Sequence, residues 1–143
     1  MAVKTKKRAM GQNIVDMILL DSTVLVDLSR GNEDAIDFVD SLRKNDQEIA
    51  ISIISSMELI IGCRNKSEVN KTLKFLGDYS IINISVPISR KAYQLIIEYS
   101  KSHGLVIPDA FIAATALDES LTLVTSNVRH FDIIEGLGVQ KPY

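Results

Sequence analysis

One stretch decides the fold, residues 107–117, which read IPDAFIAATAL. Pro108 suits the first position of a helix, because the N–H that proline lacks would have no partner there. Asp109 then lies in the first turn, where the helix dipole favours a negative charge. Ile112 and Ala113 follow three and four residues later, so the acid shares a face with the apolar stripe of an amphipathic helix. A carboxylate in line with the core is costly unless something compensates it.

Apolar runs and helical spacing alternate along the rest of the chain. The runs predict strands at residues 17–20, 48–51, 79–84 and 121–124, with a short edge strand at 139–141. The spacing predicts helices from Ser22 or Thr23 to Gly31 and over 33–44, 54–64, 67–78 and 89–103, and a loop over 125–131. Strands that alternate with helices imply a parallel sheet with helices on both faces. We therefore expect one α/β domain at 17–143, with a central parallel sheet of four to five strands, preceded by a basic flexible extension at 1–16.

The composition excludes several classes of protein. A length of 143 residues suits one domain with an ordinary core, and the apolar runs are too short to cross a bilayer. The single cysteine, Cys63, excludes an internal disulfide framework and fits a reducing cytosol, so we expect a cytoplasmic protein. The net charge of −2 argues against a generic basic nucleic-acid binder but leaves room for a local basic rim.

A second acid, Asp21, ends the first predicted strand. Ligands of parallel α/β sheets bind outside the carboxyl ends of the strands, which favours a functional role. An acid in this position also often caps the following helix, and from the residues alone both interpretations stand.

A third acid, Glu58, lies within an apolar helix. Ile54 precedes it by four residues and Ile61 follows it by three, so Glu58 shares their face. A buried and unpaired glutamate would be neutralised or would destabilise the fold. A salt bridge is the structural alternative, but the first basic residue after it is Arg64, at the wrong spacing.

Asp21, Glu58 and Asp109 together suggest a metal site. If the three carboxylates meet, their mutual repulsion requires a cation. A cluster of carboxylate oxygens without histidine or cysteine suits Mg²⁺ or Mn²⁺. Such an ion can lower the pKa of a water molecule and stabilise an in-line phosphoryl transition state.

Four segments in this order resemble the PIN-domain family, most closely the VapC toxins of prokaryotic toxin–antitoxin pairs. The segments are Ile18–Asp27, Met57–Gly62, Pro108–Ala116 and Leu123–Phe131. Each segment is a loose motif, but four in the right order are specific, and the resemblance covers residues 17 to about 140.

The resemblance implies a Mg²⁺- or Mn²⁺-dependent endoribonuclease that cleaves RNA, with Asp21, Glu58 and Asp109 as its acidic core. The fourth position of the family pattern is Asn127, an amide that contributes no charge, and Asp132 in the same loop ranks behind it. The family further implies a homodimer and a small antitoxin whose C-terminal segment blocks the site.

Residues around these acids are weaker candidates for contact with RNA. Thr125 and Ser126 could bond a phosphate or hold their loop, and Arg129 could bind a phosphate or remain in solvent. Arg30 could face the nucleic acid or simply complement the dipole of the helix that it ends. Because Asn127 replaces an acid, a non-enzymatic PIN-like module that binds RNA or a protein with a degenerate metal site is the alternative function. A phosphoacceptor signalling domain ranks far behind, because paired acids are missing after the first strand.

Overall fold

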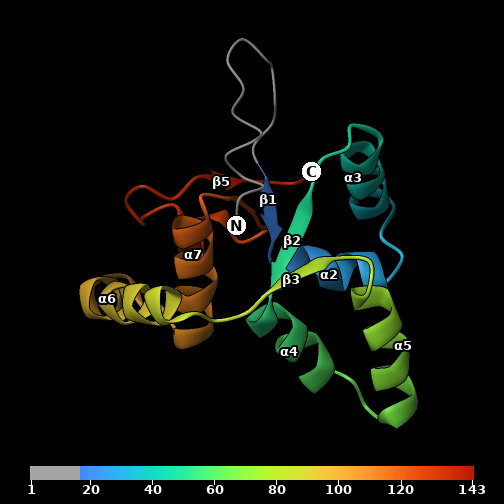
Figure 1. Cartoon of the computed structure of the whole chain (residues 1–143), viewed down its shortest axis with the longest axis horizontal. Coiled ribbons are helices and arrows are strands. Elements are labelled where there is room, and N and C mark those ends of the chain that lie inside the picture. The colour runs from blue at the N-terminus through green and yellow to red at the C-terminus, as the bar shows by residue number, and fades with distance from the viewer. Residues whose placement is uncertain (1–16) are drawn as a thin grey trace.

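Five short parallel strands form the centre of the molecule in the computed structural model (Figure 1). The strands are β1 (Ile18–Leu20), β2 (Ile49–Ser52), β3 (Ser80–Ile82), β4 (Thr122–Val124) and β5 (Val139–Gln140). They are arranged in the order β3-β2-β1-β4-β5, so the first strand is central. The predicted parallel sheet is confirmed, with β5 at one edge.

The structure describes residues 17–143, and the extension that we expected at residues 1–16 lies outside this part of the chain. In the described part, no helix is both long and apolar enough to cross a membrane.

Both faces of the sheet are buried, because neighbouring residues of a strand point to opposite sides. Leu19, with Ala50 and Leu123 beside it in register, belongs to one hydrophobic core. Ile18 and Leu20 belong to the other. The apolar runs are therefore continuous rather than alternating, as is usual for strands of a covered parallel sheet.

Helices cover each face, as predicted (Figure 1). One core contains residues of α6 (Val86–His103) and α7 (Ile107–Glu119). The other contains residues of α2 (Ser22–Ser29), α3 (Glu33–Lys44) and α5 (Lys66–Leu76). The remaining helices are α4 (Ile53–Ile61) and α8 (Val128–Phe131).

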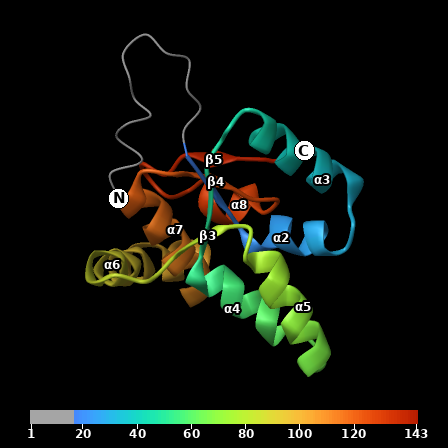
Figure 2. The same cartoon turned by 45° about the vertical axis from the view of Figure 1, so that its right-hand side comes forward.

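Helix α7 is buried over most of its circumference rather than along one stripe. Its buried residues are Ala110, Ile112, Ala113, Ala114, Thr115 and Ala116. The small alanine side chains allow the backbone to lie close to its neighbours, so the helix is wedged between the sheet and α6 (Figure 2). This packing fixes the position of the first turn, which contains Asp109.

Several predicted boundaries were wrong, and one predicted loop is a helix. Helix α4 ends at Ile61 instead of residue 64, and α5 covers Lys66–Leu76 instead of residues 67–78. Strand β3 covers only residues 80–82 of the expected 79–84. Helix α6 begins at Val86 instead of Ser89, because the hydroxyl of Ser85 accepts the N–H of Ile88 at 3.3 Å and caps the helix there. Residues 128–131, expected as loop, form the short helix α8, which buries Phe131 in the core.

Two isoleucines offer a matched test of the core. Ile112 is 0% exposed in α7, whereas Ile61 is 83% exposed at the end of α4. We expect Ile112→Ala to lower the free energy of unfolding by about 2–5 kcal/mol, because it leaves a cavity. Ile61→Ala should change it by about 0.5 kcal/mol or less. Urea unfolding of both variants measures the difference, and equal effects would contradict this packing.

Candidate active site

The predicted site residues lie on elements that meet around the carboxyl ends of the central strands. Asp21 directly follows β1, and Thr125 directly follows β4. The end of β2 leads without a loop into α4, which carries Glu58. In Figures 1 and 2, α4 lies beyond the strands, with α7 on one side and α5 on the other. The fold thus gathers acids from three distant parts of the sequence.

Asp21 is buried, and two threonine hydroxyls hold its carboxylate. Oδ2 accepts a hydrogen bond from Thr125 Oγ1 at 2.7 Å and another from Thr23 Oγ1 at 3.1 Å. Asp21 occupies the N-cap position of α2, but its side chain makes no capping hydrogen bond. The Asp21 carboxylate therefore does not cap α2, and the structural alternative from the sequence is wrong.

The same two threonines also hold the loop after β4. Thr23 Oγ1 accepts the N–H of Ser126 at 3.1 Å, and Thr125 Oγ1 accepts the N–H of Asn127 at 3.0 Å. Sequence reasoning missed Thr23, although a hydroxyl residue two positions after a strand-end acid was a usable signal. Thr125 is 0% exposed, and of the two roles that the sequence left open its bond to the Asn127 N–H matches the second, holding the loop. Its hydroxyl is buried against Asp21, and it also orients that carboxylate.

Asp109 lies in the first turn of α7, as predicted, and is partly buried. Burial raises the pKa of its carboxyl above the usual range, and the charge of Asp21 raises it further. His130 opposes this shift, since its Nδ1 lies 3.4 Å from Oδ2 of Asp109. The structure therefore places His130 at the exposed edge of the acidic site, in contact with an acid.

Glu58 has no basic partner. Arg64, the nearest candidate in the sequence, pairs with Glu68 at 2.7 Å. Oε1 of Glu58 is buried and has no hydrogen-bond partner in the described structure. Burial raises the pKa of its carboxyl, the nearby Ser22 hydroxyl lowers it, and the charges of Asp21 and Asp109 raise it. Within residues 17–143 the salt-bridge alternative is thus absent, and one buried oxygen of this partly buried acid remains without a partner.

The three acids are electrostatic neighbours without forming a closed cage. Within residues 17–143, no three histidine, cysteine, aspartate or glutamate side chains are close enough together to hold a metal ion as they stand. Burial is the main cause of the raised pKa values of Glu58 and Asp109, and the charge of Asp21 raises both further, so the acids do interact with one another. The unpartnered oxygen of Glu58 has the donor chemistry that a hard divalent cation requires. The chemistry of this donor set, three carboxylates with one unpartnered oxygen, fits such an ion.

The remaining candidate residues lie on the loop after β4, on α8 and at the end of α2. Asn127 is exposed at the start of α8, and its side chain makes no capping hydrogen bond. Ser126 and Arg129 are exposed on the same loop and helix, and Asp132 ends that helix. Arg30 is exposed at the end of α2, beside a groove that Glu58 also lines.

The C-terminal segment supports the loop of the site, which the sequence did not indicate. The N–H of Thr125 donates to the carbonyl of Gln140 at 3.1 Å, so the end of β5 lies beside the start of the loop after β4. The hydroxyl of Tyr143 donates to the carboxylate of Asp27 on α2. Burial together with this bond raises the pKa of Tyr143 to about 12. Asp27 is thus structural, as a fastening point for the end of the chain.

The two glutamates Glu58 and Glu68 should respond to pH in opposite directions. The folded-state pKa of Glu58 is raised, so its charge opposes folding, increasingly as pH rises through that pKa. We expect Glu58→Gln to raise the melting temperature without divalent cations at neutral pH, and the gain to vanish below the unfolded pKa. Bonds from Arg64 lower the pKa of Glu68, so Glu68→Gln should lose stability above the unfolded pKa. Melting curves from pH 4 to pH 8 test this, and a loss in Glu58→Gln at neutral pH would contradict it.

A second matched pair tests the hydroxyl that holds Asp21. Thr125→Val removes the bond to Asp21 and the acceptor of the Asn127 N–H, so we expect it to cost about 1–3 kcal/mol in free energy of unfolding. Thr122→Val on β4 serves as the control, because the Thr122 side chain makes no hydrogen bond in the described structure. Its effect should stay within about 0.5 kcal/mol. Equal costs in urea unfolding would remove the special role of Thr125.

Comparison with known proteins places the chain in a family. The family model for the PIN domain matches residues 18–136. Ribonuclease VapC10 of Mycobacterium tuberculosis (strain ATCC 25618 / H37Rv) is 38% identical over 122 residues, which cover 85% of this chain and 90% of the relative.

Solved structures agree with the match in sequence. A toxin–antitoxin complex from Klebsiella pneumoniae contains a chain with a TM-score of 0.72 and 35% identity, covering 88% of this chain and 98% of that one. VapBC2 from Rickettsia felis, bound to a DNA fragment from its promoter, gives a TM-score of 0.75 at 29% identity, with coverage of 87% and 98%. The chain belongs to the PIN-domain family, and its relatives within that family are VapC ribonucleases.

Proposed function

We propose that this protein is a divalent-cation-dependent endoribonuclease, the toxin of a prokaryotic toxin–antitoxin pair. The observation that carries the proposal is the uncompensated acidic site. A buried oxygen of Glu58 has no partner; burial raises the pKa of this carboxyl, and the neighbouring charges of Asp21 and Asp109 raise it further. Membership of the PIN-domain family, in which a relative is named as a ribonuclease, supports RNA cleavage as the reaction at this site.

Asp21, Glu58 and Asp109 would hold Mg²⁺ or Mn²⁺ through carboxylate oxygens. The bound cation would act as a Lewis acid toward the phosphodiester and offset the repulsion among the acids. The site offers oxygen donors without cysteine, which favours these hard ions over zinc. Asn127, a neutral residue in the fourth position, favours one tightly held ion over two.

The chain's own residues prepare the reaction by holding their positions. Thr23 and Thr125 fix the Asp21 carboxylate in one orientation, so little reorganisation is needed when the substrate arrives. The amide of Asn127 is exposed at the rim, where its carbonyl can accept a hydrogen bond from the attacking water and orient it. In hydrolysis, the water oxygen attacks phosphorus and releases a proton to solvent, while the bond to the leaving ribose oxygen breaks on the opposite side and that oxygen takes up a proton from solvent.

Two protein partners belong to this proposal. The Klebsiella pneumoniae and Rickettsia felis relatives are described as toxin–antitoxin assemblies, which supports a small antitoxin for this chain. A homodimer is supported by an exposed apolar stripe. Val86, Tyr93 and Ile97 lie on one face of α6, and Ile107 begins the helix that carries Asp109. RNA as substrate and a free Cys63 fit action in the cytoplasm.

A non-enzymatic PIN-like module is the second candidate. Asn127 replaces an acid, and no three candidate ligands of the described chain are yet close enough to hold an ion. This candidate predicts RNA binding without cleavage in any divalent cation.

The decisive test is cleavage of structured and unstructured RNAs in Mg²⁺ and in Mn²⁺. We expect cleavage by the wild type that EDTA abolishes, and a loss of about a hundredfold or more in Asp109→Asn, since one charged oxygen ligand is removed. Asp37→Asn, an exposed acid on α3, is the control and should cleave normally. Circular dichroism confirms that both variants fold.

The two candidates give different results in this assay. Cleavage that persists in Asp109→Asn would remove that acid from the reaction. RNA binding by the wild type with no cleavage in either cation would establish the non-enzymatic module instead.

A further inference from the structure

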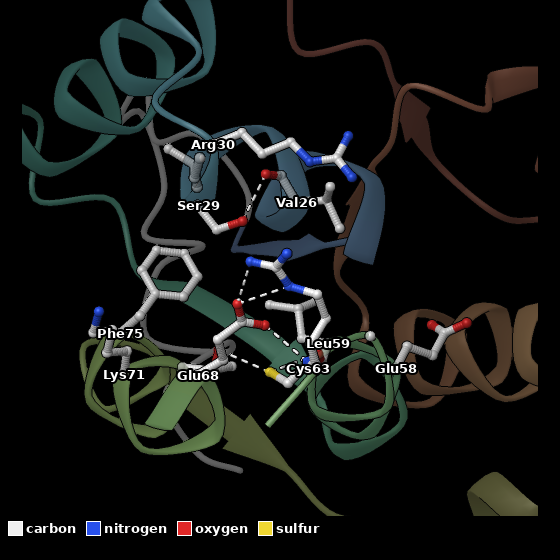
Figure 3. Close-up of a pocket in the computed structure, with 13 residues that line it drawn as sticks. Val26, Ser29, Arg30, Glu58, Leu59, Cys63, Glu68, Lys71 and Phe75 are labelled. Carbon is white, nitrogen blue, oxygen red and sulfur yellow. Dashed lines mark hydrogen bonds and ion pairs between the residues drawn. The ribbon is translucent and has the colours of Figure 1, made fainter. Parts of the chain in front are cut away.

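A groove of about 830 Å³ opens beside the acidic site, between α2, α4 and α5 (Figure 3). Its wall includes Glu58, so the groove begins at one of the proposed metal ligands. The other residues that line it include Leu28, Arg30, Leu59, Arg64, Lys71 and Phe75. A polymer whose reacting bond lies at the acids could therefore continue into this groove without leaving the surface.

The groove carries a local excess of positive charge. Three cations, Arg30, Arg64 and Lys71, line it against two acids, Glu58 and Glu68, which leaves a balance of +1 in a chain whose net charge is −2. Cations beside an acidic reaction centre attract a phosphate backbone that the acids alone would repel.

Two of these cations are available for a ligand. The Arg64 guanidinium is occupied, since its Nη2 and Nε bond one oxygen of Glu68 at 2.7 and 3.0 Å. Arg30 makes no ion pair within residues 17–143, and Lys71 acts on Glu68 only through its charge. Figure 3 shows Arg30 on the side of α2 and Lys71 at the opposite side of the view from Glu58. The free cations thus flank the groove rather than gather at one point.

The groove also has an apolar wall. Leu59 lies next to Glu58 on α4, and the Phe75 side chain enters the groove from α5. The ring of Phe75 packs edge-on against Tyr79 with 5.6 Å between ring centres, which holds its orientation. A positively charged track beside a fixed aromatic ring is the combination that binds single-stranded nucleic acid.

We propose that this groove binds single-stranded RNA on one side of the cleaved bond. Phosphates of the flanking nucleotides contact Arg30 and Lys71, and an unstacked base lies against Leu59 and Phe75. The assignment rests on the proposed nuclease function and adds to it the track that the substrate follows. It also assigns a role to Arg30, which caps the C-terminal end of α2, whereas Asp21 of the acidic cluster is at the N-terminal end of that helix.

Binding is measured separately from cleavage, in Asp109→Asn protein and by the fluorescence anisotropy of a labelled unstructured oligoribonucleotide. Arg30→Ala/Lys71→Ala in this background should weaken affinity about tenfold, since each exposed phosphate contact is worth about threefold. The slope of log affinity against log salt should fall by about 0.7 for each lost contact. Lys44→Ala/Lys91→Ala, two exposed cations on α3 and α6 outside the groove, is the matched control and should change neither quantity.

Cleavage of two substrates by otherwise wild-type protein completes the test. We expect the double substitution to raise KM about tenfold for the long oligonucleotide and to leave kcat unchanged. The shortest substrate that is cleaved should be unaffected, because it does not reach the groove.

Two other outcomes of these experiments would contradict the proposal in different ways. Unchanged affinity and salt slope, with cleavage by the wild type intact, would overturn the groove assignment, leave the nuclease function standing and give the groove to a protein partner. Absence of both RNA binding and cleavage in the wild type would overturn the nuclease function, and this inference with it.

Discussion

The whole site depends on one buried carboxylate, Asp21, at the carboxyl end of the central strand. Its position follows from the core, since β1 is hydrogen-bonded on both sides and its residues are fully buried. Its orientation follows from Thr23 and Thr125, whose hydroxyls bond the same oxygen. Because Thr125 follows β4, the two neighbouring strands must pair in register before this carboxylate can be held. The pairing of β1 with β4 that forms the sheet therefore also orients the Asp21 carboxylate.

Two further acids near Asp21, Glu58 and Asp109, are partly buried without a buried basic side chain beside them in the described structure. Glu58 and Asp109 have raised pKa values, and the sequence supplies no buried base beside them. A fold optimised only for stability would replace these acids by apolar or amide residues. The divalent cation proposed for this site would account for their presence, and the proposed RNA track would run along the cation-lined groove beside Glu58.

Supporting contacts extend outward from the acids to the ends of the described chain. The loop after β4 is held at Ser126 by the hydroxyl of Thr23 and at Thr125 by the carbonyl of Gln140, the last residue of β5. Three residues further along the chain, the hydroxyl of Tyr143 donates to Asp27 on α2. Ser126 and Asn127 are therefore exposed residues on a loop with defined positions, which is the arrangement that substrate contact requires.

The sequence alone determined the class of fold, because continuous apolar runs and 3.6-residue spacing report directly which faces are buried. It also singled out the three acids as candidates, since Glu58 and Asp109 share faces with apolar residues, against the ordinary rule for charges, and Asp21 ends a strand. It could not determine hydrogen bonds between residues a hundred positions apart, such as Thr125 to Asp21, or the helix at 128–131. These arise only when β1 and β4 pair, because side-chain partners across a sheet are set by register and not by local spacing. The groove beside Glu58 was decided in the same way, by the packing of three helices whose residues are distant in the sequence.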